Sequence, residues 1–200
     1  GHGVTTLPVP ADAAAIRGRL GLPDGYVLAI ATLEPRKGLD VLIEAMTRPA
    51  TRDAHLVVVG PPGWGEVDLP AAAAAAGLAP DRLHAVGRLA DRDLAAVLAG
   101  AAVLAAPSRA EGFGLPVLEA MAAGVPVVVS DAPALVELVG PAGLVARRED
   151  PAALPRAIGE VLDDPAAAAD LAARGRERAA GYTWAAAAAQ VWDVHVGARR

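Results

Sequence analysis

Short apolar runs alternate along this chain with segments in which apolar residues recur at helical spacing. The runs are rich in Val, Ile, Leu and Ala, and they cover residues 26–31, 55–59, 83–86, 103–106, 125–129 and, as a short sixth run, 144–145. Continuous apolar strands are typical of a parallel sheet that is covered on both faces. Because parallel neighbours need a crossover connection, the alternation of strand and helix predicts an α/β fold with a doubly wound, mostly parallel sheet.

The segments between and after the strands predict the helices. They cover residues 11–20, 67–76, 91–99, 116–123, 152–162 and 165–178, with further helices from Leu39 and after Thr183. We expect Asp91, either Asp163 or Asp164, and Thr183 to cap helices, because their oxygens can accept hydrogen bonds from a first turn. Two hundred residues suit one domain. The expected division is an entry linker with a short helix over 1–24, a Rossmann-like domain over 25–181 and a terminal helix over 182–200.

The terminal helix is expected to carry an apolar stripe, formed by Trp184, Ala187, Ala188, Val191 and Trp192. Two tryptophans on one stripe require a partner surface. We expect this surface to be the core of the same domain; the alternative is a contact with a domain missing from this chain. The chain begins without an initiator methionine, which indicates a trimmed or excised chain.

Charge and composition argue against several classes of function. The net charge is -5 and no basic cluster exceeds two arginines, so nucleic acid is a poor candidate for a partner. The absence of cysteine excludes disulfides, thiolate nucleophiles and cysteine-ligated metals, and it is compatible with a cytoplasmic location. The four histidines lie far apart and form no metal-binding motif, so we expect no metal site. No apolar run reaches the ~20 residues of a membrane span, and we expect a soluble protein.

The loop after the fourth strand, residues 107–115, carries the strongest functional signal. It leads into a helix whose first residue is expected to be Pro116, where the missing N–H of proline costs nothing. The cap position is then Leu115, which has no oxygen to offer the free N–H groups of the first turn. A glycine-flanked helix start with free donors and a positive dipole end is typical of an anion site, and phosphate is the usual anion.

Two carboxylates, Glu111 and Glu119, lie eight positions apart across this loop and helix. A phosphate repels a carboxylate, and an ionised carboxylate only accepts hydrogen bonds. We therefore expect the pair to take hydroxyl donors on either side of the phosphates, as a nucleotide sugar would present them. The alternatives are an exposed loop residue for Glu111 and, for Glu119, a first-turn glutamate that complements the helix dipole.

The predicted sheet brings a second loop to the same edge. In the common strand order 3-2-1-4-5-6, the first and fourth strands flank the switch point, and ligands bind outside their carboxyl ends. The loop after the first strand, residues 32–38, contains Arg36 and Lys37, which offer a guanidinium fork and a point charge to phosphate oxygens. The alternative is a solvated pair of cations. This loop has neither the G-x-G-x-x-G fingerprint of dinucleotide sites nor a Walker motif.

Three stretches of the sequence are similar to one family. They read TLEPRKGLDVLIEA, VGRLADRDLAAVLAGAAVLAAPS and EGFGLPVLEAMAAGVPVV, and an early HGV and a late YTW fit the same pattern. Over nearly all of residues 2–184 the chain resembles the retaining glycosyltransferases of the GT-B fold, in the large group often called family 4. In that family two Rossmann-like domains face each other, and the first binds the acceptor while the second binds the sugar donor. This chain resembles only the second, C-terminal domain.

The resemblance implies roles for the charged loop residues. Lys37 and Glu111 would be the catalytic residues. Lys37, together with Arg36, would hold the donor diphosphate, and Glu111 would bond sugar hydroxyls beside Gly112 and Phe113.

It also implies roles for the flanking positions. Three backbone N–H groups would face the diphosphate, those of Phe113, Gly114 and Leu115. Glu119 would hold the ribose, and Arg88 and Leu89 would border the nucleobase, although turn chemistry explains the glycine before them equally well. Many relatives have Gly-Arg just after the first strand. This chain has Ala31-Thr32 there, which matches a subgroup with the TLEPRK string.

The implied reaction is transfer of a sugar from a nucleoside diphosphate with retained configuration, without a cofactor or metal, the departing phosphate itself drawing the acceptor proton. The residues themselves support one part of this, since they offer electrostatic stabilisation of a leaving diphosphate and no obvious side-chain base. The implied partners are the nucleoside-diphosphate sugar and the missing N-terminal acceptor-binding domain, so this chain alone is expected to bind donor without transfer.

A peripheral membrane contact of the full-length protein is not excluded, and a GDP-linked mannosyl donor is suggested by the subgroup string only. The alternatives in function are a non-catalytic nucleotide-binding or interaction module and a nucleotide-sugar epimerase of similar fold.

Overall fold

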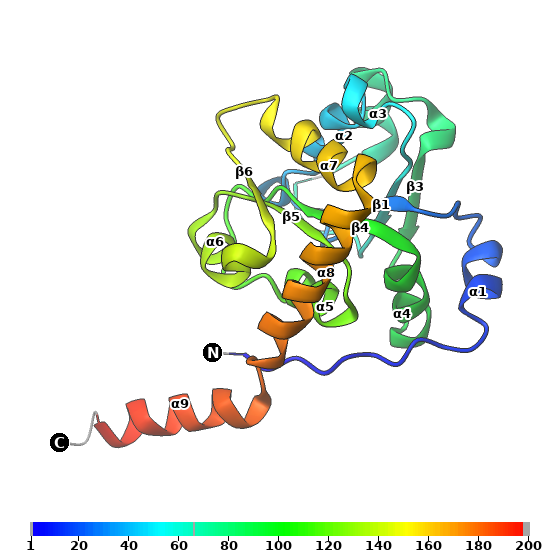
Figure 1. Cartoon of the computed structure of the whole chain (residues 1–200). Coiled ribbons are helices and arrows are strands. Elements are labelled where there is room, and N and C mark those ends of the chain that lie inside the picture. The colour runs from blue at the N-terminus through cyan, green and yellow to red at the C-terminus, as the bar shows by residue number, and fades with distance from the viewer. Residues whose placement is uncertain (1, 66, 198–200) are drawn as a thin grey trace.

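The computed structural model describes residues 2–65 and 67–197, and within them it contains one six-stranded parallel sheet (Figure 1). The strands are β1 (Tyr26–Ile30), β2 (Leu56–Val59), β3 (Leu83–Gly87), β4 (Ala101–Ala106), β5 (Val127–Ser130) and β6 (Leu144–Ala146). Their order is β3-β2-β1-β4-β5-β6, and every neighbouring pair is parallel. The predicted fold class and strand order are therefore confirmed, with the switch point between β1 and β4.

Both faces of the sheet are buried, because successive residues of a strand point to opposite sides. In β1, Val27 and Ala29 belong to one hydrophobic cluster, whereas Tyr26 and Leu28 belong to the other. Helices cover both faces: α2 (Leu39–Ala45), α3 (Leu69–Ala76) and α7 (Ala153–Asp163) on the first, and α4 (Asp91–Gly100), α5 (Leu115–Ala123) and α6 (Pro133–Val139) on the second. This double cover explains why β2 and β5 are buried at every residue.

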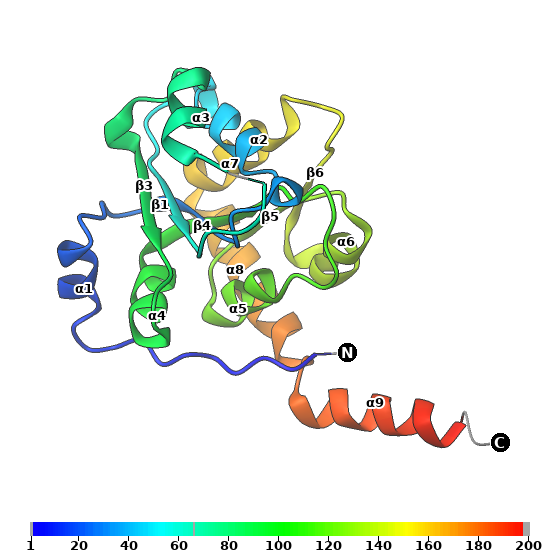
Figure 2. The ribbon, with the colours of Figure 1, turned by 180° about the vertical axis from the view of Figure 1, so that it is seen from behind.

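The remaining elements lie outside this sandwich. Helix α1 (Ala13–Arg19) packs against α4, α8 (Pro165–Ala180) packs along α5, and α9 (Trp184–Gly197) ends the described chain. In the described part of the chain, four short 3-10 turns connect the larger elements: η1 (Pro35–Lys37), η2 (Pro49–Thr51), η3 (Pro80–Arg82) and η4 (Gly140–Ala142). The two views show α9 projecting from the body beside the N-terminal segment (Figure 1, Figure 2).

The helix starts confirm two of the expected caps and correct a third. The carboxylate of Asp164 accepts two N–H groups from the first turn of α8, both at 3.0 Å, and the Thr183 hydroxyl accepts one from α9 at 3.1 Å. The cap assigned to Asp91 is wrong, because Ala90 holds the cap position and Asp91 is the first helical residue, where its charge complements the helix dipole. Helix α6 was not expected, because seven residues contain too few apolar repeats to show a period.

The expected packing of α9 onto the core is wrong. Trp184, Val191 and Trp192 are 59%, 62% and 66% exposed, and within the stripe Ala187 alone is buried. The chain turns between the end of α8 and the cap at Thr183, so α9 leaves the body rather than continuing along it. An apolar face of this kind fits the alternative, a partner surface outside this chain.

Candidate functional site

The loops that follow β1 and β4 touch at the carboxyl edge of the sheet. Lys37 ends η1, and Gly38 follows it with a φ of 67° before α2 begins. A Cβ atom at Gly38 would lie 2.3 Å from the carbonyl oxygen of Pro107, which follows β4. Glycine is required at this position both for its left-handed backbone and for the close approach of the two loops.

An ion pair joins the two loops. The ammonium of Lys37 lies 2.5 Å from Oε2 of Glu111, and each side chain is only 13% exposed. The same carboxylate accepts hydrogen bonds from the Ser108 hydroxyl at 3.3 Å and from the Gly112 backbone N–H at 3.1 Å. Nη1 of Arg36 lies 3.7 Å from its other oxygen, Oε1. The sequence assigned Lys37 and Glu111 to different groups of a ligand, and the structure pairs them with each other.

Glu111 is held in its ionised form and still has acceptor capacity. Burial raises the pKa of its carboxyl, but the hydrogen bond and charge of Lys37, with smaller contributions from Gly112 and Arg36, outweigh burial and lower the pKa below 4.5. A carboxylate offers about four lone-pair directions. Lys37, Ser108 and Gly112 use three of them. About one direction is left for an outside hydroxyl.

Lys37 also stands out by its residue type. It is the only lysine among the 18 lysine and arginine residues of the chain. A lysine supplies a compact point charge with three rotatable donors, which a planar guanidinium cannot imitate. The position of the one lysine at the switch point therefore marks this turn independently of any motif.

The start of α5 forms the third side of the site. Leu115, which is 40% exposed, is the first helical residue, and Gly114 holds the cap position with a φ of 95° and no side-chain cap hydrogen bond. The expected cap at Leu115 is therefore wrong by one residue, because none of the first four N–H groups of a helix has an intrahelical partner and proline fits the second position as well as the first. The consequence is unchanged, since glycine has no side-chain oxygen for the first turn either.

The predicted residues of this loop border two cavities. Lys37, Glu111 and Gly114 line a cavity of about 20 Å³, which is enough for about one water molecule, so an anion would sit at its mouth. Gly112 and Phe113 line a second cavity of about 460 Å³, together with Glu137 and Tyr182. The ring centroid of Phe113 lies 4.6 Å from that of His2 and 6.0 Å from that of Tyr182.

The other predicted site residues are not brought into the same cavity. Glu119 lines a separate cavity of about 30 Å³ with the N-terminal segment and α4, and burial, followed by the charge of Asp91, raises the pKa of its carboxyl. Arg88 is exposed and Leu89 is half-buried after β3. Arg36 is 41% exposed and directs Nε to Glu34 at 2.7 Å, so part of its guanidinium is already bonded.

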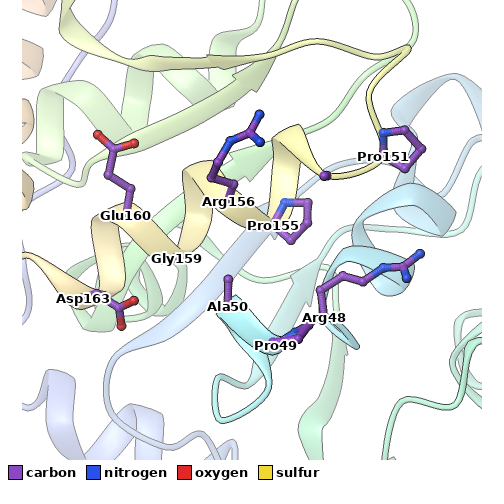
Figure 3. A pocket seen from close by; sticks show the side chains of 10 residues that line it. Arg48, Pro49, Ala50, Pro151, Pro155, Arg156, Gly159, Glu160 and Asp163 are labelled. Carbon is purple, nitrogen blue, oxygen red and sulfur yellow. The ribbon is translucent and has the colours of Figure 1, made fainter.

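A larger groove of about 650 Å³ lies between η2 and α7 (Figure 3). Its floor is apolar. Glycine at position 159 allows α7 to pass close to η2, because a Cβ there would lie 2.9 Å from the Cβ of Ala50. Its two arginines are already paired, Arg48 with Glu44 and Arg156 with Asp150. The groove shares no lining residue with the cavity of Lys37 and Glu111.

Two features of the described part of the chain concern metals and membranes. Among these residues, no three side chains of His, Asp or Glu gather as a metal site would require. No helix there combines the length and the apolar character that crossing a bilayer requires.

The fold and its switch-point loops define this chain as a Rossmann-like α/β domain with a candidate ligand site at the carboxyl ends of β1 and β4. Residues 14–178 match the family of glycosyl transferases group 1, and the chain belongs to this family. Its neighbours among solved structures are GT-B glycosyltransferases, as the resemblance predicted.

Individual relatives support this assignment. The MMP α-(1→4)-mannosyltransferase of Mycolicibacterium hassiacum is 38% identical over 198 residues, covering 94% of this chain and 47% of that protein. O-antigen chain mannosyltransferase B of Escherichia coli is 39% identical over 163 residues, covering 80% of this chain and 42% of that protein. The chain spans about half the length of the curated relatives it matches.

Two solved structures extend the likeness to three dimensions. Sucrose-phosphate synthase from Thermosynechococcus elongatus has a TM-score of 0.81 at 33% identity, with 98% of this chain and 51% of that chain covered. Anabaena HepE in complex with UDP and glucose has a TM-score of 0.82 at 26% identity, with 95% and 53% covered. In both cases the matching part is about half of the other protein.

Proposed function

We propose that this chain is the donor-binding domain of a retaining glycosyltransferase and binds a nucleoside-diphosphate sugar at the carboxyl ends of β1 and β4. The observation that carries the proposal is the Lys37–Glu111 pair beside the start of α5. It combines a cation for phosphate, an acceptor for hydroxyls and the positive end of a helix in one cavity wall. The likeness to HepE, which was solved with UDP and glucose, supports the same ligand class.

The diphosphate would bind over the small cavity. An ammonium has three donors, so Lys37 can keep Glu111 and still donate to a phosphate oxygen. Arg36 would add the exposed part of its guanidinium, and the N–H groups of Phe113, Gly114 and Leu115 would complete the anion site at the helix start.

The rest of the donor would extend to either side of the diphosphate. The free lone pair of Glu111 would accept a sugar hydroxyl, with Gly112 and Phe113 beside the ring. Glu119 would accept from the ribose, although burial and Asp91 favour its protonated form and would have to be offset by the ribose contact. Arg88 and Leu89 would border the base.

Catalysis would come from stabilising the leaving diphosphate. Lys37 and the helix start oppose the charge that develops on the phosphate as the bond to the sugar breaks, and such preorganised groups contribute most where water is excluded. The departing phosphate would draw the proton of the acceptor hydroxyl, so no side-chain base and no metal or other cofactor is required. The sugar would be transferred with retained configuration.

The acceptor would bind to a domain that this chain lacks. The relatives are about twice as long, and the exposed tryptophans of α9 offer an apolar face for further protein. The N-terminal segment meets the start of α9, with the Val4 N–H donating to the Tyr182 carbonyl at 2.9 Å, so both ends leave the body at one place. We therefore expect this chain to bind the donor without transferring its sugar. We place the protein in the cytoplasm, and the proposal is compatible with a peripheral membrane contact of the full-length protein.

Calorimetric titration of the chain with GDP, UDP, ADP and dTDP tests the proposal. We expect one of the four to bind with a micromolar dissociation constant, and we expect Lys37→Ala to weaken that binding by about tenfold or more. Arg156→Ala is the matched control, because Arg156 is a 69% exposed cation in the groove of Figure 3 and should leave the affinity unchanged.

The outcomes separate the alternatives. The proposal is contradicted if none of the four nucleotides binds at millimolar concentration, which would favour an interaction module. It is also contradicted if Lys37→Ala and Arg156→Ala bind equally well, because the nucleotide would then lie away from the switch point.

A further inference from the structure

We propose that Arg109 and Asp40 form a latch that positions Lys37 against Glu111; this inference rests on the donor site proposed above. Arg109 lies in the loop after β4, two residues before Glu111. Its guanidinium reaches the first turn of α2 and donates to both oxygens of Asp40, at 2.8 Å and 2.6 Å. A bidentate pair of this kind fixes the orientation of both side chains more strictly than a single contact does.

Two further hydrogen bonds run between the same segments. Nη1 of Arg109 donates to the carbonyl oxygen of Pro35 at 2.7 Å, and its backbone N–H donates to the carbonyl oxygen of Arg36 at 2.7 Å. The acceptors lie on both sides of Lys37 in sequence, and the donor residue lies beside Glu111. The four bonds therefore fix the separation of the two segments from which the ion pair is built.

The outer side of the loop is held as well. Arg148, which follows β6, donates to the carbonyl oxygen of Arg109 and directs Nε to Asp131 at 2.5 Å. The Ser130 hydroxyl donates to the carbonyl oxygen of Ser108 at 2.5 Å. With the loop anchored from the β5 and β6 side, loss of the three side-chain bonds of the latch leaves the η1 side held by the Arg109 backbone N–H, and the distance between Lys37 and Glu111 changes.

A general contribution to stability is the competing explanation, and the exposure of the pair argues against it. The side chains of Arg109 and Asp40 are 47% and 60% exposed, and ion pairs this open to water stabilise a fold only slightly. The hydrogen bonds from Arg109 nevertheless lower the pKa of the Asp40 carboxyl, so the latch is ionised at neutral pH. Four bonds confined to the two site segments fit a positioning role.

The single lysine makes the inference directly testable. Lysine labelled with ¹³C and ¹⁵N gives one side-chain ammonium signal in this chain, and a hydrogen-bonded, little-exposed ammonium exchanges slowly enough with water to be observed by NMR. We expect the signal in the unliganded chain to be lost in Arg109→Gln and in Asp40→Asn. The dissociation constant for GDP, which is used as the probe, should rise by about 5- to 20-fold in both variants. Asp40→Glu, which keeps the carboxylate, should retain most of the ammonium signal and of the affinity.

Arg174 on α8 provides a matched control. It pairs with Asp170 at 2.6 Å and donates to the carbonyl oxygen of Pro141, and the side chains of Arg174 and Asp170 are 42% and 64% exposed. These contacts resemble those of the latch, but they lie on α8 and η4 rather than on the two site loops. Arg174→Gln should keep the ammonium signal and bind GDP within about twofold of the wild type. Both glutamine variants should lower the melting temperature by no more than about 4 °C.

The two readouts judge the two proposals separately. The latch is overturned if Arg109→Gln and Asp40→Asn keep the ammonium signal, or if Arg174→Gln loses it equally. If the wild-type chain does not bind GDP or the other nucleotides but its signal depends on the latch, the donor site is overturned and the positioning of Lys37 by Arg109 is supported.

Discussion

Arg82 and Lys37 are cations with little or partial exposure at opposite edges of the sheet, and they have different partners. Arg82 precedes β3 at the amino edge, where its guanidinium donates to carbonyl oxygens at 2.6 to 2.9 Å, those of Met46, Thr51 and Ala54. Lys37 follows β1 at the carboxyl edge, where its ammonium pairs with the carboxylate of Glu111.

The difference lies in the partners. Backbone carbonyls are fixed by the fold, and they occupy Nε and Nη2 of Arg82 so fully that little is left for a ligand. Burial lowers the pKa of Arg82, and the charges of Asp53 and Asp81 oppose that effect. Lys37 has a side-chain partner on a loop and donors to spare. We therefore expect Arg82 to stabilise the domain and Lys37 to bind a ligand. Replacing each cation in turn tests this difference.

The largest expected effect is on catalysis. In the full-length enzyme, Lys37→Ala should lower turnover by roughly two orders of magnitude, because losing one donor to a developing phosphate charge costs ~3 kcal/mol. Steady-state kinetics with the donor identified by calorimetry measures this, and a thermal melt of the same variant checks that it is folded. Unchanged turnover would remove Lys37 from the site and end the contrast with Arg82.

Arg82→Ala should have the opposite profile. It removes the guanidinium donor from three carbonyl oxygens, of which that of Thr51 keeps the N–H of Ala54. We expect the free energy of unfolding to fall by about 2 kcal/mol, or the melting temperature by about 4 to 8 °C. Nucleotide affinity should stay within about twofold of the wild type. Arg52→Ala is the control from the same region, because Arg52 is 74% exposed and its loss should change stability by less than about 0.5 kcal/mol. Equal melting temperatures for the two variants would contradict a structural role for Arg82.

The sequence predicted the sheet well, because buried parallel strands are read directly from continuous apolar runs. The order of the strands followed from a topological rule, which places the loops of Lys37 and Glu111 at the same edge of the sheet. The placement of α9 was not predictable in the same way. Its apolar stripe shows that a face requires cover but not what covers it, and Trp184 and Trp192 proved to be exposed.

The site was predicted in outline and missed in its connections. Motif and topology identified Lys37 and Glu111 as neighbours across the switch point, but the ion pair between them depends on side-chain geometry that spacing does not encode. The bond between Arg109 and Asp40 joins residues 69 positions apart, and such a pair leaves no periodic trace in one sequence. The roles of individual residues toward a ligand stay predictions until nucleotide binding is measured.

The smallest expected effect is a difference between the two edges of the sheet in how their contribution to stability depends on pH. His55 and His84 lie at the amino edge with Nδ1 and Nε2 3.2 Å apart, where two neutral rings can share one hydrogen. Burial lowers the pKa of His84, and the charge of His55 lowers it further, while Asp81 opposes them. As the pH falls, His84 in the unfolded chain is therefore protonated near its usual pKa of 6.5, before His84 in the folded chain. The contribution of His84 to the free energy of unfolding is present above that pH and is lost as the pH drops below it.

Glu111 at the carboxyl edge responds in a lower window. Its pKa is depressed from 4.5, so its contribution is present above that pH and is lost as the pH falls through the folded value. Urea unfolding at a series of pH values distinguishes the edges. His84→Gln should remove much of the stability loss between about pH 7 and 5. Glu111→Gln should show that loss unchanged, but it should lose less stability than the wild type as the pH falls below 4.5. Parallel profiles for His84→Gln and the wild type down to about pH 5 would show that the histidine pair does not couple to folding, leaving Arg82 as the tested structural group of that edge.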